Sequence, residues 1–384
     1  MRNRLTVFLF GILLFLFSVA DIFTSDCFFS QSENRILQQK PEFTMKNLLS
    51  GKYGKEYEDY SSDQFIGRDR WIGFKTRTEM TLGQVMINGV YLGKEESLFE
   101  QHLSKYAGGD GRLEENAERK LTKLVSDIKQ YRSVCKDGEV RVMLVPSAYT
   151  IWENRLPPYT ASLQFSETDF LEEGREQIER SFPGERIWVD VQAVLAEHAT
   201  EEVYYRTDHH WTTLGAYYGY TAWADSMDMD VVLAEKLEQK TVSSDFQGTL
   251  QSKLNIPWEK DIIKVFLKPD EPMYELIYDM GEKTSDSLYE ESYLNTKNQY
   301  GFFLDDNHGL ITIRTNGTKQ QERSIVVIKD SYANCFVPFL TEYYGTVYVI
   351  DRRYYRGNVS EFLEEKQIQD VLVLYNVIQF LENY

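Results

Sequence analysis

The clearest pattern of apolar and polar positions lies between residues 113 and 131. Apolar side chains recur there at spacings of three and four, which places them along one face of a helix. The pattern predicts a long amphipathic helix built on Leu113, Ala117, Leu121, Leu124, Ile128 and Tyr131. Directly after it, residues 140–145 form a compact β-branched run that ends at Pro146, which is typical of a buried central strand.

Helical and strand-like patterns continue to alternate along the rest of the chain. Helices are predicted at 167–182, where Ser166 can cap the first turn, at 192–198, after Thr212, at 332–344 and at 359–366. Strands are predicted at 187–191, 324–328, 346–350 and 370–375. This alternation predicts an α/β fold with a mostly parallel sheet and helices on both of its faces.

The alternation stops between residues 231 and 321. This stretch is rich in Tyr, Pro and Asp and contains only short strand-like pieces. We interpret it as a β-rich insertion beside the functional site. Before the alternation begins, residues 85–93 carry glycines among β-forming residues, which favours a hairpin or edge strands.

The first residues form a distinct apolar segment. Arg2 and Arg4 precede a nearly unbroken apolar run from Leu5 to Phe23, with acidic residues on its far flank. A run of about nineteen residues is close to the length that crosses a bilayer and exceeds a typical signal-peptide core. Residues 1–25 are therefore predicted to be an uncleaved signal anchor that holds the rest of the chain outside the membrane. Cleavage and secretion is the alternative.

Composition narrows the classes of partner. The 60 acidic and 42 basic residues give a formal charge of −18, which repels polyphosphate and argues against nucleic acid as a partner. The three cysteines, Cys27, Cys135 and Cys335, do not describe a disulfide framework, so stability must come from the core. After the anchor, we expect a stalk and helical lead-in at 26–80 and one domain at 81–384.

Reactive side chains gather in two short segments, Thr207-Asp-His-His-Trp-Thr212 and Lys329-Asp-Ser-Tyr-Ala-Asn334. In the second segment, a predicted strand runs directly into Ser331 and a predicted helix follows it. Such a turn presents the hydroxyl at the carboxyl edge of the sheet, where helix N–H groups can stabilise an oxyanion. An isolated Asp-Ser pair is also an ordinary helix cap, so this segment alone does not establish a nucleophile.

The first segment supplies what a serine nucleophile needs. Side chains two residues apart in an extended chain point the same way, so Asp208 can hold the imidazole of His210 while the other ring nitrogen faces Ser331. Asp208, His210 and Ser331 are therefore the candidate catalytic triad. We interpret His209, pointing opposite to His210, as structural or substrate-lining. Trp211 is interpreted as packing, with stacking on a sugar as the alternative.

A zinc site at the same residues is a competing interpretation. Asp208, His209 and His210 offer three ligands, but the histidines at positions 102, 198 and 308 are not paired at ligand spacing. We therefore expect no metal and no cofactor.

The segment Thr207-Asp-His-His-Trp-Thr-Thr-Leu-Gly-Ala216 resembles the bacterial DHHW proteins, relatives of the alginate O-acetylation proteins within the wider SGNH hydrolase group. In those relatives an Asp-x-His pair precedes the serine, and the three residues correspond here to Asp208, His210 and Ser331. Further motifs extend the resemblance over nearly all of the exported portion: Ser32-Glu-Asn-Arg35, Asp63-Gln-Phe65, Gly89-Val-Tyr-Leu-Gly93, Val145-Pro-Ser147 and Lys329-Asp-Ser-Tyr-Ala-Asn334.

The resemblance implies a flavodoxin-like sheet and the transfer or removal of acetyl groups on a surface polysaccharide. It also implies a place often beside a membrane-bound O-acyltransferase. Together with the predicted anchor, this puts the protein on the outer side of the bacterial cytoplasmic membrane. Lys329 stands where the common hydrolase block has glycine, so the oxyanion donors do not follow from the family. The backbone N–H groups of Ser331 and Tyr332 are the leading candidates, and Asn334 is a weaker one. A non-catalytic glycan-binding or scaffold protein with the same fold is the alternative function.

Overall fold

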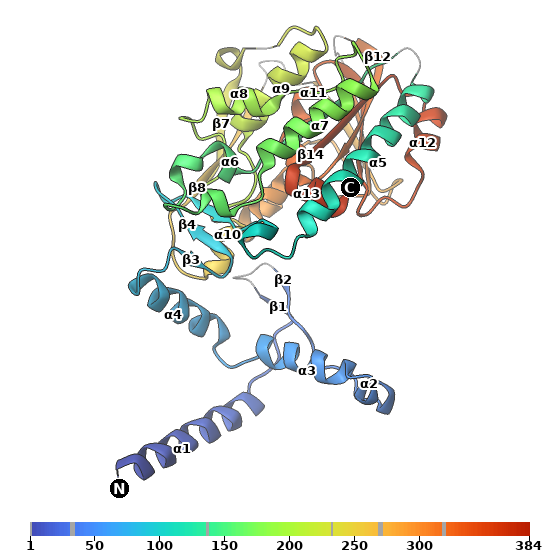
Figure 1. Ribbon diagram of the computed structural model, residues 1–384. Helices are drawn as coiled ribbons and strands as arrows, with labels where there is room; N and C mark the ends of the chain where they lie inside the picture. Colours follow the sequence, from blue (N-terminus) through green and yellow to red (C-terminus); the bar gives the residue numbers. More distant parts are fainter. Residues whose placement is uncertain (1, 31–34, 136–137, 232, 268–271, 317–319) are drawn as a thin grey trace. The chain divides into compact units, whose positions relative to one another are not determined.

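The computed structural model describes residues 2–30, 35–135, 138–231, 233–267, 272–316 and 320–384 (Figure 1). These residues form two compact units. The N-terminal unit comprises the chain up to Asn88 together with Gln251–Pro257, and the sheet unit comprises Gly89–Leu250 and Trp258–Tyr384.

The N-terminal unit begins with the apolar helix α1 (Arg2–Ile22). Its stretch Arg4–Asp21 is long and hydrophobic enough, by length and composition, to cross a membrane. The other elements of this unit are β1 (Phe29–Ser30), β2 (Arg35–Ile36), α2 (Met45–Leu49), α3 (Lys52–Asp63), α4 (Arg68–Thr81) and β3 (Met86–Ile87).

Two of the sequence motifs meet in the N-terminal unit. The Arg35 guanidinium donates to both carboxylate oxygens of Asp63, at 2.8 and 2.5 Å, and the Gln38 N–H donates to the same carboxylate at 2.8 Å. The bonds from Arg35 hold the pKa of Asp63 below its usual range. Residues 32–34 of the first motif lie outside the described residues. The ion pair fastens the segment before α2 to the end of α3.

A seven-stranded sheet forms the centre of the sheet unit, in the order β10-β9-β11-β13-β12-β14-β6. Strands β13, β12, β14 and β6 run parallel, and Val327 of β12 is aligned with Val349 on one side and Leu372 on the other. The strands are β6 (Val140–Val145), β9 (Tyr274–Tyr278), β10 (Lys283–Ser285), β11 (Leu310–Thr315), β12 (Gln320–Lys329), β13 (Tyr344–Asp351) and β14 (Asp370–Asn376).

Side chains of the central strands alternate between two hydrophobic clusters. Val140, Val142 and Leu144 of β6 pack into one cluster, and Met143 and Val145 pack into the other. Successive side chains of a strand point to opposite faces, so the clusters lie on the two sides of the sheet. One side is covered by α5 (Arg112–Val134), α7 (Glu167–Ser181), α12 (Val359–Glu365) and α13 (Val377–Asn383), and the other by α8 (Val191–Glu197) and α9 (Thr213–Ser226) (Figure 1).

The central sheet is mixed, so the prediction of a mostly parallel sheet holds for β13, β12, β14 and β6 but not for the strands of the insertion. Strands β9, β10 and β11 come from the stretch 231–321 and extend the sheet beyond β13. Their three pairings are antiparallel, against three parallel pairings among the other strands. This part of the insertion joins the sheet because Leu310, Ile311 and Ile313 bury apolar side chains beside β13.

The remaining strands of the sheet unit form small antiparallel pairs. Strand β4 (Val90–Leu92) pairs with β5 (Leu98–Glu100), in the region where short strands were predicted. Strand β7 (Glu238–Phe246) pairs with β8 (Asp261–Leu267) inside the insertion. Two short helices, α6 (Ala148–Ile151) and α10 (Thr249–Leu254), follow strand ends near the candidate site; the last residues of α10 belong to the N-terminal unit.

The prediction of a strand at 187–191 is wrong. Only Trp188 forms a bridge, parallel to Val142, and Val189 donates one hydrogen bond to the same residue. Asp190 then caps α8, so the chain turns away from the edge of the sheet after a single pairing.

The prediction of a single helix at 332–344 is also wrong. Ser331–Cys335 form a 3-10 turn, Val337–Leu340 form the short helix α11, and β13 already begins at Tyr344. Pro338 has no backbone N–H, so an α-helix running through this position would lose a hydrogen bond. The serine turn is therefore not backed by the long helix dipole that the sequence suggested.

The predicted cap of α7 provides a test of helix stability. The Ser166 side chain accepts a hydrogen bond from the Asp169 N–H at 3.3 Å, and Ser166 is exposed, so its replacement changes the cap with little effect on packing. We expect Ser166→Ala to lower the free energy of unfolding by about 1 kcal/mol. Ser166→Asp keeps a hydrogen-bond acceptor at this position and should retain most of the free energy of unfolding that the cap contributes. Urea denaturation checks this expectation, and equal losses in the two variants would contradict it.

Candidate active site

The turn that contains Ser331 is held by the buried carboxylate of Asp330. One carboxylate oxygen accepts the Tyr332 N–H at 2.9 Å and the other accepts the Asn376 N–H at 2.8 Å, so the end of β12 is tied to the end of β14. Burial raises the pKa of Asp330 to about 6. The half-buried Ser331 thus lies at the carboxyl edge of the parallel strands, where ligands bind in open α/β sheets.

The loop 207–212 folds back on the residues before it. Trp211 forms an antiparallel bridge with Tyr204, and the His210 carbonyl accepts the Tyr205 N–H at 3.2 Å. Thr212 then caps α9 through its side chain. The histidine is therefore placed on a short, hydrogen-bonded turn instead of a free loop.

The three residues singled out in the sequence meet at this point. His210 Nε2 lies 2.8 Å from Ser331 Oγ, and His210 Nδ1 lies 2.5 Å from Asp208 Oδ1. Because the Asp208 carboxylate can only accept, we assign the ring hydrogen to Nδ1. Nε2 is then free to accept the hydrogen of the serine hydroxyl.

Electrostatics favour a charged Asp208 and a neutral His210. Burial alone would raise the pKa of Asp208, but the charges of His209 and His210 and the hydrogen bonds it accepts hold that pKa well below its usual range. Burial, aided by repulsion from His209, lowers the pKa of His210 to about 4, although Asp208 acts in the opposite direction. The neutral imidazole is the form that can take up a proton.

The insertion supports Asp208 from the other side. The second carboxylate oxygen accepts hydrogen bonds from the Thr249 N–H at 2.8 Å and from the Thr249 hydroxyl at 3.0 Å. Gly248 approaches so closely that a β-carbon there would overlap the Asp208 carboxylate. Glycine at position 248 therefore allows the backbone to pass directly against the Asp208 carboxylate.

Tyr300, which the sequence analysis missed, packs flat against the His210 imidazole. The ring centroids are 3.8 Å apart and the rings are inclined by 12°. The Tyr300 hydroxyl donates to the Ser331 carbonyl at 3.1 Å and lies 3.3 Å from Cys335 Sγ. Tyr300 thus contacts both halves of the site. No local pattern marks it, because the insertion contains many tyrosines and only the fold distinguishes this one.

The structure separates the two residues that were candidates for substrate contact. The His209 ring lies beside His210, with centroids 3.9 Å apart, and does not point away from it as we expected. His209 is partly exposed, and its Nδ1 lies 2.8 Å from the Thr249 hydroxyl. Trp211 is fully buried and donates from Nε1 to the Tyr332 carbonyl at 2.8 Å. Sugar stacking on Trp211 is therefore ruled out by burial, and its role is to join the two segments.

Two of the three candidate oxyanion donors are already engaged. The Tyr332 N–H donates to Asp330, and the Nδ2 amide of the fully buried Asn334 donates to the Asp306 carbonyl at 3.3 Å. These contacts remove Tyr332 and Asn334 as donors to a substrate. Within the described part of the chain, the Ser331 N–H forms no hydrogen bond, so it stays a candidate.

Lys329 is buried below the serine turn. Its Nζ donates to Asn307 at 2.7 Å and lies 3.5 Å from the carboxylate of Asp351. Burial lowers the pKa of Lys329, whereas Asp351 acts to raise it. The side chain links the end of β12 to the insertion.

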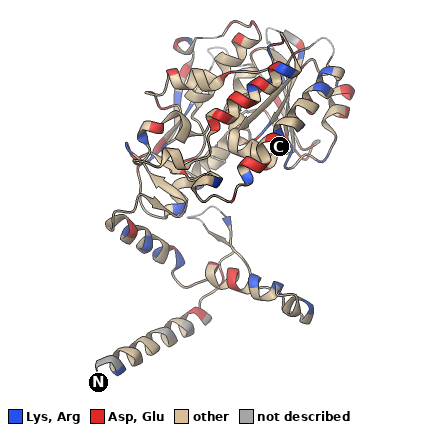
Figure 2. Cartoon of the chain, viewed as in Figure 1, with Lys and Arg blue, Asp and Glu red and all other residues tan. Residues whose placement is uncertain are grey.

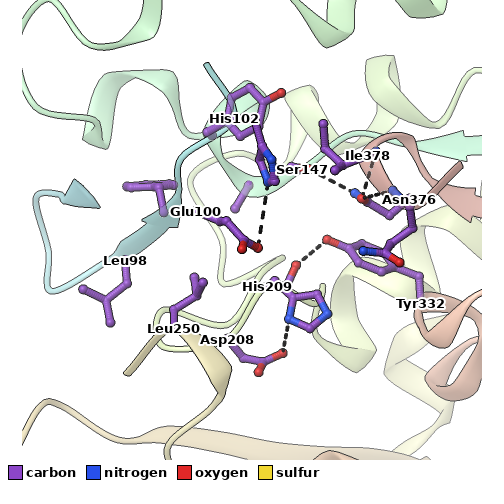
Figure 3. A pocket seen from close by; sticks show the side chains of 14 residues that line it. Leu98, Glu100, His102, Ser147, Asp208, His209, Leu250, Tyr332, Asn376 and Ile378 are labelled. Carbon is purple, nitrogen blue, oxygen red and sulfur yellow. Dashed lines mark hydrogen bonds and ion pairs between the residues drawn. The ribbon is translucent and has the colours of Figure 1, made fainter. Parts of the chain in front are cut away.

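A small, open cavity adjoins the site on the side of Asp208 and His209 (Figure 3). Polar and aromatic side chains gather around it, and the Tyr332 hydroxyl donates to the His209 carbonyl at its edge. The Asn376 amide donates to the Ser147 hydroxyl at 3.0 Å on another wall. Its polar and aromatic lining includes Glu100, His102, Ser147, Tyr149, His209, Tyr332 and Asn376.

Metal binding at this site would compete with the hydrogen bonds just described. Asp208, His209 and His210 each offer one ligand atom, and these atoms lie within 4.8 Å of one another. Both ring nitrogens of His210 already serve Asp208 and Ser331, so coordination by this ring would break one of those bonds. The donor set therefore suits the serine arrangement better than a closed metal site.

A model of the DHHW protein family matches residues 187–350 of the chain. The resemblance to the DHHW family is confirmed. The DHHW match includes the turn that holds His210 and the strand β12 that leads to Ser331, so both halves of the site lie inside it. No curated protein matches the chain.

Solved structures share the fold of this chain at low sequence identity. A DHHW family protein from Eubacterium siraeum DSM 15702 is 22% identical, has a TM-score of 0.62, and matches over 77% of this chain and 93% of that chain. PatB1 of Bacillus cereus, solved with a sulfonyl adduct, is 17% identical, has a TM-score of 0.58, and matches over 76% of this chain and 95% of that chain. Both similarities show that the fold is shared.

The charge state of His210 can be measured directly. We expect its ring, followed by NMR in the full chain, to titrate near pH 4, well below the usual value of about 6.5. Asp208→Asn removes an attractive charge and should lower the His210 pKa further. His209→Gln removes a repulsive charge and should raise it. Titration of His210 near its usual value in the unmodified protein would contradict the buried, neutral imidazole.

Proposed function

We propose that this protein is an extracellular enzyme that transfers or hydrolyses O-acyl groups, most simply acetyl groups, on a cell-surface or exported polysaccharide. The observation on which the proposal rests is the continuous hydrogen-bonded series from Ser331 through His210 to Asp208, at 2.8 and 2.5 Å. A nucleophile, a base and an orienting carboxylate in this order form the recurring arrangement of serine acyl-transfer enzymes.

The proposed reaction has two steps. In the first, Ser331 Oγ attacks the ester carbonyl while His210 Nε2 takes its proton, and the imidazolium then returns that proton to the departing alcohol. An acyl-serine remains. In the second step, His210 takes a proton from an acceptor hydroxyl or from water, the acceptor attacks the acyl carbon, and the proton returns to Ser331 Oγ. Asp208 stays charged and stabilises the imidazolium in both steps.

Stabilisation of the oxyanion is assigned to the Ser331 N–H. This group is the backbone amide of the nucleophile itself, which supplies one oxyanion donor in several serine enzymes. Among the described residues, none accepts a hydrogen bond from the Ser331 N–H. No second donor is assigned, because the Tyr332 N–H donates to Asp330 and the Asn334 amide donates to the Asp306 carbonyl.

The proposed substrate class follows from the cavity and from the family resemblance. Carboxylate, amide, hydroxyl and imidazole groups beside the rings of Tyr149 and Tyr332 suit a ligand rich in hydroxyls, which needs hydrogen bonds and flat apolar contacts. A polysaccharide has this chemistry. We place the protein on the outer face of the cytoplasmic membrane, anchored by α1, where a membrane-bound O-acyltransferase would be its acyl-supplying partner.

The nucleophile is tested by covalent labelling and by hydrolysis of an acetyl ester such as p-nitrophenyl acetate. PatB1 was solved with a sulfonyl adduct. We therefore expect a sulfonyl fluoride or fluorophosphonate to modify Ser331 and to stop hydrolysis. Ser331→Ala and His210→Ala should each lower kcat/KM by at least about 10³-fold. Ser133→Ala, at an exposed serine of α5, is the matched control.

Other outcomes separate the alternatives. Equal rates in the unmodified protein, Ser331→Ala and His210→Ala would refute catalysis and favour a glycan-binding or scaffold protein. Activity that survives Ser331→Ala and disappears with a chelator would instead indicate a metal at Asp208, His209 and His210.

Tyr300 is expected to act as a positioning residue for His210. Tyr300→Phe keeps the stacked ring and loses the hydroxyl contacts, so we expect kcat/KM to fall by less than about 10-fold, whereas Tyr300→Leu removes the flat ring and should cost about 10²-fold. Loss of the ring also admits water to the imidazole, which raises the His210 pKa. The acidic limb of the pH–rate profile should therefore move to higher pH in Tyr300→Leu. An unchanged profile, with a lowered melting temperature only, would show a purely structural role.

A further inference from the structure

Large apolar side chains are exposed in the N-terminal unit just after the apolar helix α1. They gather in α2 and at its flanks, in the segment that we call the juxtamembrane surface (residues 40–57). The exposed fractions are 61% for Phe43, 62% for Met45, 45% for Leu48 and 83% for Leu49. Apolar side chains this exposed, four of them within seven residues, mark a surface that binds another phase or partner.

The charge of the same segment is opposite to that of the whole chain. Residues 40–57 contain four exposed lysines and two acidic residues, whereas the whole chain has a formal charge of −18 (Figure 2). The lysines are Lys40, Lys46, Lys52 and Lys55, and the acids are Glu42 and Glu56, the second of which lies 3.5 Å from Lys52. Apolar side chains interleaved with lysines are typical of segments that lie at an anionic lipid surface.

Aromatic rings connect this surface to the end of α1 that faces the exported part. Phe43, Tyr53, Tyr57 and Tyr60 form a series with successive ring centroids 5.2, 5.8 and 5.7 Å apart. The Tyr60 hydroxyl donates to Asp26, directly after α1, at 2.9 Å. If α1 crosses the bilayer, the rings therefore lie near its interface, where tyrosine and other amphipathic aromatics are enriched.

We propose that the juxtamembrane surface docks on the anionic phospholipid headgroups of the bilayer that α1 spans. Phe43, Met45, Leu48 and Leu49 would enter the interface, and the lysines would pair with lipid phosphates. The inference depends on the anchor and not on the chemistry at Ser331. Its consequence is that the protein has two contacts with the membrane, one that spans it and one that lies on it.

The experiment uses the full chain in lipid nanodiscs with a fluorescent label on the surface. Cys27 is the exposed cysteine and Cys135 and Cys335 are buried, so Cys27→Ser leaves a background for a single label. Leu49→Cys carries an environment-sensitive dye. Glu172→Cys, at an exposed position of α7, carries the same dye as the matched control.

In nanodiscs that contain phosphatidylglycerol, we expect the dye at position 49 to shift its emission to the blue and to be quenched by lipids with a nitroxide on the headgroup. The control dye should show neither effect. Lys46→Gln and Lys52→Gln should each lower the docking equilibrium constant about fivefold, and only when phosphatidylglycerol is present.

Two results would overturn the proposal. Equal quenching of the two dyes, or emission at position 49 like that in water, would show that the surface stays in solution. Protection of position 49 from aqueous iodide without quenching by the headgroup nitroxide would show that protein covers the surface instead of lipid.

Discussion

The hydrogen bond from Trp211 Nε1 to the Tyr332 carbonyl joins two segments that lie 121 residues apart in the chain. It is made in the core, where a missing partner would leave a polar group unpaired at a cost of about 1–3 kcal/mol. His210 precedes this tryptophan and Ser331 precedes this tyrosine. The buried bond therefore holds the two segments together directly beside the reactive side chains.

The insertion contributes more to the site than its irregular sequence suggests. Thr249 donates a hydrogen bond to the second carboxylate oxygen of Asp208, and Gly248 lacks a β-carbon that would overlap that carboxylate. Tyr300 packs against the face of the imidazole, and Asn307 accepts a hydrogen bond from Lys329. None of these residues supplies a reacting group in the proposed reaction. Together they decide how fixed the reacting groups are, which is what preorganisation requires of a catalytic site.

Much of the sheet unit could be predicted from local patterns, because its central strands are continuous β-branched runs and α5 has an unbroken apolar stripe. The three residues of the candidate triad could be singled out because two short motifs concentrate the necessary groups. Errors occurred where long-range contacts decide the outcome. Residues 187–189 have the sequence pattern of a strand but form a single bridge, between Trp188 and Val142. The strands of the insertion join the sheet through apolar contacts that no local hydrophobic pattern indicates.

Side-chain roles were harder to predict than positions. Tyr332 and Asn334 occupy the expected turn, yet the Tyr332 N–H donates to Asp330 and the Asn334 amide donates to the Asp306 carbonyl, and no sequence pattern indicates these contacts. Trp211 was ambiguous for the same reason, since an indole can either stack on a ligand or pack in a core. Only its complete burial distinguishes the two.

The walls of the cavity beside the triad come from separate parts of the chain. Ser147 follows β6, Asn376 ends β14, and Glu100 ends β5, whereas Ser331 follows β12. The turn after β12 supplies both Ser331 and Tyr332 of the wall, but the walls at Ser147, Asn376 and Glu100 come from other strands. A substitution at a wall position such as Glu100 can therefore change which ligands the cavity binds without altering the contacts that hold the reacting groups. Ligand selectivity and reactivity can thus change independently in this architecture.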